Sequence, residues 1–155
     1  MTNNDILRRL RYTFDFNDSK MIALFGLADY ATTRAEVSDW LKKEEDEAFQ
    51  ELSDQNLAIF LNGLIKDKRG KREGPQPKPE KVLDNNIILR KLTIALTLRD
   101  AAMMKIFDLA GVKIGKHELS AFFRKPIQSQ YRPCKDQYLR NFLRGLQLKY
   151  RSKDK

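Results

Sequence analysis

The chain has 155 residues, which is enough for one well-packed core or two small ones. Lys and Arg number 30 against 21 Asp and Glu, and the resulting net charge of +9 favours a polyanionic partner. No apolar run is long enough to cross a bilayer, and with one cysteine and no secretory signal we expect a reducing cytoplasm.

Four segments within the first 72 residues carry apolar residues at helical spacing. Each begins at a polar residue suited to cap a helix, and the fourth ends in basic residues followed by Gly70, as helices commonly do. The alternating Val, Ile and Thr runs typical of strands are missing from the sequence. The predicted N-caps are Asn3 or Asn4, Asp18, Thr32 or Thr33, and Ser53 or Asp54.

Residues 73–82 contain Pro75, Pro77 and Pro79, which alternate with polar residues. Because proline fixes its backbone and cannot donate a hydrogen bond, this segment favours an extended linker over a helix.

Beyond the linker the chain repeats itself at an offset of 82 residues. Between positions 3–71 and 85–153, 23 of 69 aligned residues are identical without a gap, which indicates a tandem duplication. Units of this size have modest cores, so we expect the two to pack together through pseudo-twofold-related faces. We predict an all-α fold of about eight helices, with a first repeat at 1–72, the linker at 73–82 and a second repeat at 83–155.

A glycine interrupts the fourth predicted helix of each copy, at Gly63 and at Gly145. Glycine within a helix costs about 1 kcal/mol relative to alanine. Its presence in both copies favours close approach by the backbone of another helix over a notch for a ligand.

Few residues are suited to catalysis. His117 is the single histidine and nothing in the pattern activates Cys134, so neither a His/Cys metal site nor a thiol nucleophile is predicted. The acidic run at 44–47 becomes Pro-Ile-Gln-Ser in the second copy, which favours a solvated turn over a cation site. We predict no enzyme activity, cofactor or metal. The alternative is a cleft at the repeat junction with the paired carboxylates Asp18, Asp100, Glu36 and Glu118.

Charge separates the two copies. Residues 1–72 hold 12 Lys and Arg against 13 Asp and Glu, whereas residues 73–155 hold 18 against 8. Such a basic surface attracts phosphate backbones without reading sequence. We predict a nucleic-acid (polyanion) binding module whose contact residues are Lys113, Lys116, Arg124, Lys125, Arg140, Arg144, Lys149, Arg151 and Lys153.

Two other interpretations of this charge stay open. The segment 21–43 resembles a helix-turn-helix, and in the second copy Lys116, His117, Ser120 and Arg124 would face the major groove of DNA. Alternatively, the basic repeat contacts an acidic protein or a second subunit, which would make the protein an interaction adaptor or a homodimer.

Several short motifs resemble the YehS-like family of uncharacterised bacterial proteins. They are Asn-Asn-Asp-Ile-Leu-Arg at 3–8, Phe-Leu-Asn-Gly-Leu-Ile at 60–65, Asn-Asn-Ile at 85–87 and Phe-Leu-Arg-Gly-Leu at 142–146. The resemblance covers essentially the whole chain. It implies a bacterial cytoplasmic protein with a duplicated fold, and it supplies no activity or catalytic residues, because the family is a domain of unknown function.

Overall fold

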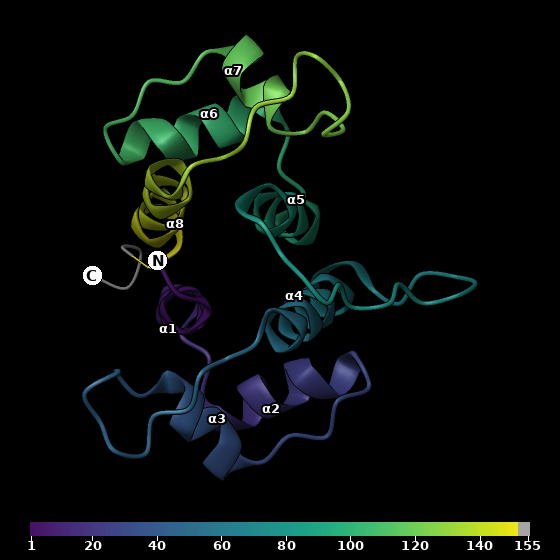
Figure 1. The fold of residues 1–155 in the computed structure, drawn as a ribbon, viewed down its shortest axis with the longest axis vertical. Coiled ribbons are helices and arrows are strands. Elements are labelled where there is room, and N and C mark those ends of the chain that lie inside the picture. Colours follow the sequence, from purple (N-terminus) through teal and green to yellow (C-terminus); the bar gives the residue numbers. More distant parts are fainter. Residues whose placement is uncertain (152–155) are drawn as a thin grey trace.

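The computed structural model describes residues 1–151, and over that range it contains helices and no strand, which confirms the predicted all-α fold (Figure 1). The eight helices are α1 (Asn3–Phe14), α2 (Asp18–Leu27), α3 (Arg34–Leu41), α4 (Asp54–Arg69), α5 (Asn85–Leu96), α6 (Asp100–Leu109), α7 (Lys116–Ala121) and α8 (Asp136–Tyr150).

Each helix of the first repeat begins at a side chain that caps it. Thr33 and Ser53 accept a hydrogen bond from the backbone three residues on, so one of the two predicted caps is confirmed for each of α3 and α4. The predictions for α1 and α2 are wrong by one or two positions, because the caps are Thr2 and Asn17. Several polar residues precede each apolar run, and apolar spacing alone does not decide which of them caps the helix.

Asn4, predicted as a possible cap, instead ties distant segments together. The side chain is 1% exposed, and its Nδ2 donates to Trp40 O and Gln50 O at 2.9 and 2.8 Å. Its Oδ1 accepts from Leu52 N at 3.0 Å. The asparagine kept in both copies therefore holds the connection between the third and fourth helices against the first. Asn86 repeats all three bonds, with Phe122 O, Arg132 O and Cys134 N.

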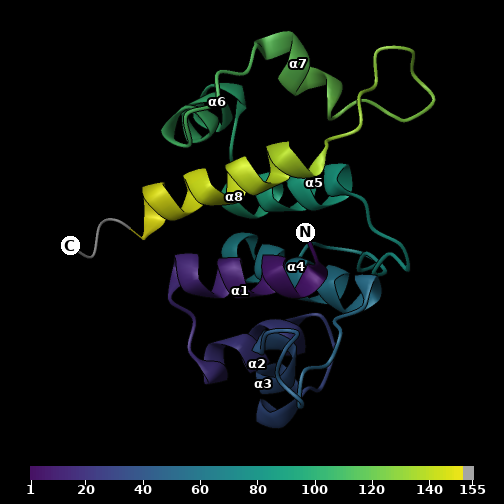
Figure 2. The same ribbon diagram turned by 60° about the vertical axis from the view of Figure 1, so that its left-hand side comes forward.

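The two repeats pack against each other around an approximate twofold axis. Two layers of helices meet at the centre of the molecule: α1 and α4 form one layer, and their copies α5 and α8 form the other (Figures 1 and 2). α4 lies against α5 and α1 lies against α8, so the two seams between the repeats are equivalent under the duplication. The pairs α2–α3 and α6–α7 cover the two outer ends (Figure 2).

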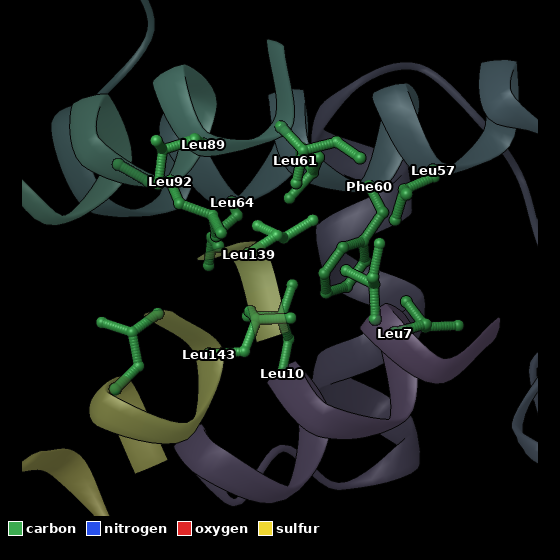
Figure 3. Close-up of a cluster of buried hydrophobic side chains, with 14 of the residues drawn as sticks. Leu7, Leu10, Leu57, Phe60, Leu61, Leu64, Leu89, Leu92, Leu139 and Leu143 are labelled. Atoms are coloured by element: carbon green, nitrogen blue, oxygen red, sulfur yellow. The ribbon is translucent and has the colours of Figure 1, made fainter. Parts of the chain in front are cut away.

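A single hydrophobic core runs through both repeats. Its centre consists of leucines from α1, α4, α5 and α8 that point toward one another (Figure 3). These leucines are the same residue in both copies, so the duplication supplies both sides of the interface. The equivalent pairs are Leu7 and Leu89, Leu10 and Leu92, Leu57 and Leu139, and Leu61 and Leu143.

Identical arginines clasp the repeats reciprocally. Arg69, at the end of α4, donates to Ile94 O and Thr97 Oγ1 at the C-terminus of α5, at 3.3 and 3.2 Å. Arg151 occupies the equivalent position after α8 and donates to Tyr12 O and Asp15 Oδ1 at the C-terminus of α1, at 2.8 and 3.2 Å. A cation placed at the end of a helix satisfies its last carbonyls and opposes the negative end of its dipole.

Gly63 and Gly145 bring the fourth helix of each repeat onto the backbone of the second. A Cβ added to Gly63 would lie 1.8 Å from Leu24 O, and one added to Gly145 would lie 2.0 Å from Ile106 O. No side chain fits at these distances. The prediction of close helix approach is therefore confirmed for both glycines.

Candidate polyanion-binding surface

The predicted contact residues fall into two zones of the second repeat. Lys113 precedes α7, Lys116 begins it, and Arg124 and Lys125 follow it. The other zone lies along α8, which passes beside α1 toward its C-terminal end (Figure 2). It comprises Arg140, Arg144, Lys149 and Arg151, whereas Lys153 lies outside the described residues.

Ion pairs within the repeat are fewer in the described part of the second repeat than in the first. Four of the 12 Lys and Arg residues at 1–72 form ion pairs with acids of the first repeat. Between residues 83 and 150, all of which the structure describes, 13 Lys and Arg residues include one in an ion pair, Lys91 with Glu80 of the linker. Six of the predicted contact residues therefore form no ion pair within the described chain: Lys113, Lys116, Arg124, Lys125, Arg144 and Lys149. Arg140 also lacks a close ion pair, but it interacts electrostatically with the carboxylate of Asp136 one turn earlier on α8.

A groove of about 820 Å³ lies between α7 and the start of α8. Three cations line it, Arg124, Arg132 and Lys135, together with the carboxylate of Glu118 and the ring of Tyr138. With His117 neutral, the lining carries a net charge of +2. The equivalent positions of the first repeat hold one cation, Lys42, and the four carboxylates of Glu36, Asp39, Glu47 and Glu51, a net charge of −3.

The second repeat has also lost helix caps that the first repeat keeps. Asn17, Thr33 and Ser53 each cap a helix, and their counterparts Arg99, Gly115 and Lys135 make no side-chain capping bond. α5 alone among the helices of the second repeat has a capping side chain, that of Asp84. A capping side chain contributes about 1 kcal/mol and its replacement by glycine costs only a few tenths, so this divergence costs the second repeat about 2 kcal/mol.

Lys135 places a cation where the dipole of α8 disfavours one. It stands at the N-cap of α8, whose unpaired N–H groups carry partial positive charge, and it lines the groove. An anion bound there would be attracted by the helix end and by the lysine together. The arrangement is unfavourable for the free protein and favourable for a phosphate ligand.

Sequence reasoning missed Arg132 and Lys135. Both lie in the connection between α7 and α8. A signal was present, since their counterparts in the first copy are the uncharged residues Gln50 and Ser53. A position that gains a cation in one copy alone marks functional divergence better than total charge does.

Arg151 and Arg124 do not have the surroundings that the sequence predicted for a phosphate contact and a recognition-helix residue. Arg151 donates to Asp15 and lies 4.1 Å over the ring of Tyr12, so part of its binding capacity holds the repeats together. Arg124 lies beyond the end of α7, which spans fewer than two turns. The four residues assigned to a recognition helix therefore do not share one helix.

The cysteine and the paired glutamates considered for catalysis are buried or hydrogen-bonded to neighbouring residues. Burial raises the pKa of the Cys134 thiol to about 12, which keeps it protonated at neutral pH. Glu36 accepts from Thr32 Oγ1 at 2.6 Å, and Glu118 accepts from Gly115 N at 3.1 Å. Within residues 1–151 no group of three His, Cys, Asp or Glu side chains is placed to hold a metal ion. No helix in that range is both long and apolar enough to span a membrane.

Comparison with known proteins places the chain in a family. The model of the family described as "Protein of unknown function (DUF1456)" matches twice, at residues 3–70 and 85–152. The Uncharacterized protein YehS of Escherichia coli (strain K12) is 40% identical over 147 residues, which cover 94% of each chain. No solved structure matches. The double match confirms the tandem duplication, and the chain belongs to this family of YehS-like proteins of unknown function.

Proposed function

We propose that the second repeat binds nucleic acid through its phosphate backbone, with the groove between α7 and α8 as the centre of the contact. One observation carries the proposal: among the described residues, no Lys or Arg between 83 and 150 forms an ion pair with an acid of the second repeat. Unneutralised surface cations are the groups that displace counterions from a phosphate backbone, and this release supplies most of the affinity of non-specific binding.

The dimensions of α8 suit an extended ligand. Its 15 residues span about 22 Å, so the groove near its N-terminus and the cations near its C-terminus lie several phosphates apart along a strand. Tyr138 lines the groove, and a ring in that position provides a surface on which a base can stack. These features favour a single strand over a duplex, and they supply no base-specific readout.

The test is binding of a fluorescein-labelled single-stranded oligonucleotide, followed by fluorescence anisotropy over a salt titration. We expect affinity to fall steeply between about 50 and 200 mM salt. The triple variant Lys116→Gln, Arg124→Gln, Lys125→Gln should weaken binding and reduce the logarithmic salt slope by about 2 to 3.

The duplication offers a matched control. Arg34→Gln, Lys42→Gln, Lys43→Gln changes the equivalent positions of the first repeat and removes the same three charges. It should leave the affinity close to that of the unmodified protein. Equal losses in the two variants would mean that net charge alone matters, and an absence of binding at low salt would refute the proposal outright.

A second function is favoured by the opposite charges of equivalent surfaces. The groove of the second repeat carries a net charge of +2, and the equivalent positions of the first repeat carry −3. The groove of one molecule therefore complements the outer end of the first repeat of another. Association of this kind is head-to-tail and builds rings or open chains of molecules. Sedimentation at low salt without nucleic acid would reveal it as a concentration-dependent rise in mass. This rise should be lost in the second-repeat triple variant and kept in the first-repeat variant, which removes cations from the acidic surface.

A further inference from the structure

A second concave site lies where the repeats meet, away from the groove described above. α4 and α5 pack side by side (Figure 1), and residues of the linker line one side of an open pocket of about 410 Å³ at their seam. Ile65, Ile87 and Ile94 supply its apolar surface, and Gln76, Pro77 and Glu80 of the linker line its other side. Ligand sites for small molecules typically measure about 300 to 1,000 Å³, so the pocket is of a size to hold a small molecule.

The charge lining this pocket is strongly unbalanced. Glu80 is the one acidic residue among its lining residues, and it stands against six basic ones. A concave site with partly apolar walls focuses such a charge and raises the local concentration of anions. The six cations are Lys66, Arg69, Lys71, Arg72, Arg90 and Lys91.

Lys91 is the cation that most needs an anion. It is 9% exposed, and its Nζ lies 2.7 Å from Asn62 Oδ1 and 3.0 Å from Glu80 Oε1. A buried ammonium group requires a counter-ion, and here the linker supplies it. The Glu80 side chain is 36% exposed, so it holds this position from the edge of the pocket and is able to move out into solvent.

Gln76 leaves a second polar group for a ligand to satisfy. Its Nε2 donates to Arg72 O and Gly74 O, which fixes the orientation of the amide. Its Oε1 is buried and has no hydrogen-bond partner within the described chain. Buried acceptors of this kind are normally satisfied, so a donor on a bound molecule would complete the site.

The fold itself does not require the residues of this site, because the equivalent seam of the molecule lacks them. The equivalent positions on the seam between α1 and α8 hold Arg9 in place of Lys91 and Arg144 in place of Asn62. The hydrogen bond between Lys91 and Asn62 is therefore particular to the seam that the linker borders.

We propose that this pocket binds a small organic anion with an apolar body. Its carboxylate or phosphate group would replace Glu80 at Lys91, its apolar part would lie against the three isoleucines, and a hydroxyl or amide N–H would reach Gln76 Oε1. The site is independent of the nucleic-acid surface, because none of the residues of the α7–α8 groove line it.

The probe is anilinonaphthalene sulfonate, an apolar anion whose fluorescence rises on leaving water. We expect saturable binding to the full chain, competed by octanoate if the site prefers a carboxylate or by phenyl phosphate if it prefers a phosphate ester. Inorganic phosphate, which has no apolar body, should compete at least tenfold less well than the better of the two. Absence of saturable binding, or competition by neither organic anion, would overturn the proposal.

Matched variants locate the binding. Lys91→Met should weaken probe affinity about tenfold or more, whereas Arg9→Met, at the equivalent position of the other seam, should not. Ile94→Glu places a carboxylate at the pocket and should weaken binding of the anionic probe. Tyr12→Glu, at the equivalent position of the other seam, is its control and should not. The two side chains are 43% and 45% exposed, so both variants should fold. Equal affinities within both pairs would refute the location.

Glu80→Gln should change the affinity for the probe in the opposite direction. Removing the internal competitor should tighten probe binding, by about fivefold if the pair with Lys91 resembles other partly exposed ion pairs. Weaker binding in Glu80→Gln would exclude displacement of Glu80. The triple variant Lys116→Gln, Arg124→Gln, Lys125→Gln should keep full probe affinity, so the two proposals fail or succeed separately.

Discussion

Gly63 lies in the middle of α4 against the backbone of α2, and its replacement by alanine measures how tightly the helices are packed. The added Cβ would stand 1.8 Å from Leu24 O and 2.7 Å from Leu24 C. Carbon and carbonyl oxygen approach to about 3.3 Å at closest, so the two helices must separate by roughly 1.5 Å. α4 also lies against α5, and the displacement therefore reaches the interface between the repeats.

We expect Gly63→Ala to lower the free energy of unfolding by about 2 to 3 kcal/mol. Overpacking of a core costs about 1 to 3 kcal/mol and at times more, and this overlap involves backbone that cannot change rotamer. The better helix propensity of alanine returns about 1 kcal/mol. Urea unfolding followed by far-UV circular dichroism measures the difference, provided that the transition is two-state.

Gly26 provides the control within the same helix pair. It lies inside α2, and a Cβ there would meet nothing within 4 Å. Gly26→Ala should therefore raise stability, by up to about 1 kcal/mol. If Gly63→Ala is as stable as the unmodified protein, the close approach of α2 and α4 is not a constraint on the fold, and the explanation for a glycine at this position of both repeats fails.

Three further predictions concern buried and titrating groups. Asn86→Ala leaves a buried N–H and two carbonyls unpaired, so urea unfolding should show a loss of about 3 kcal/mol. Cys134 should resist a thiol reagent at pH 8 in the folded protein and react at once in denaturant, since burial raises its pKa to about 12. The hydrogen bond from Asn85 lowers the pKa of Asp136 below 3.8, so its contribution to stability is complete above that pH and is lost as the pH falls through the lowered value. Asp136→Asn should flatten that acid limb in urea unfolding at a series of pH values.

Sequence reasoning reached the architecture because duplication amplifies weak signals. A helical spacing that is ambiguous once becomes reliable when it recurs 82 residues later, and Gly63 with Gly145 predicts a close helix contact that a single glycine would not. The leucines of the core were likewise visible as identical pairs. Their placement on both sides of one interface follows from the twofold arrangement.

The candidate sites were harder to predict from the sequence, because their geometry depends on loops and on contacts between residues distant in sequence. Asn4 reads as a helix cap until its partners 36, 46 and 48 residues away are known. Arg151 reads as part of a basic tail, although it reaches Tyr12 and Asp15 across the repeat interface. The linker reads as a spacer, and nothing in its prolines indicates that it lines a pocket.

The lost caps suggest how the second repeat acquired its charge, and Lys135→Ser tests the idea directly. Ser53 shows what the scaffold uses at this position when stability alone matters, since it caps α4. Restoring serine should raise the free energy of unfolding by about 1 kcal/mol and remove a cation from the groove. We therefore expect a protein that is more stable in urea and binds the oligonucleotide more weakly, with a salt slope reduced by about 1. A variant that gains stability and keeps its full affinity would show that Lys135 is a neutral substitution and that the groove does not hold the phosphates.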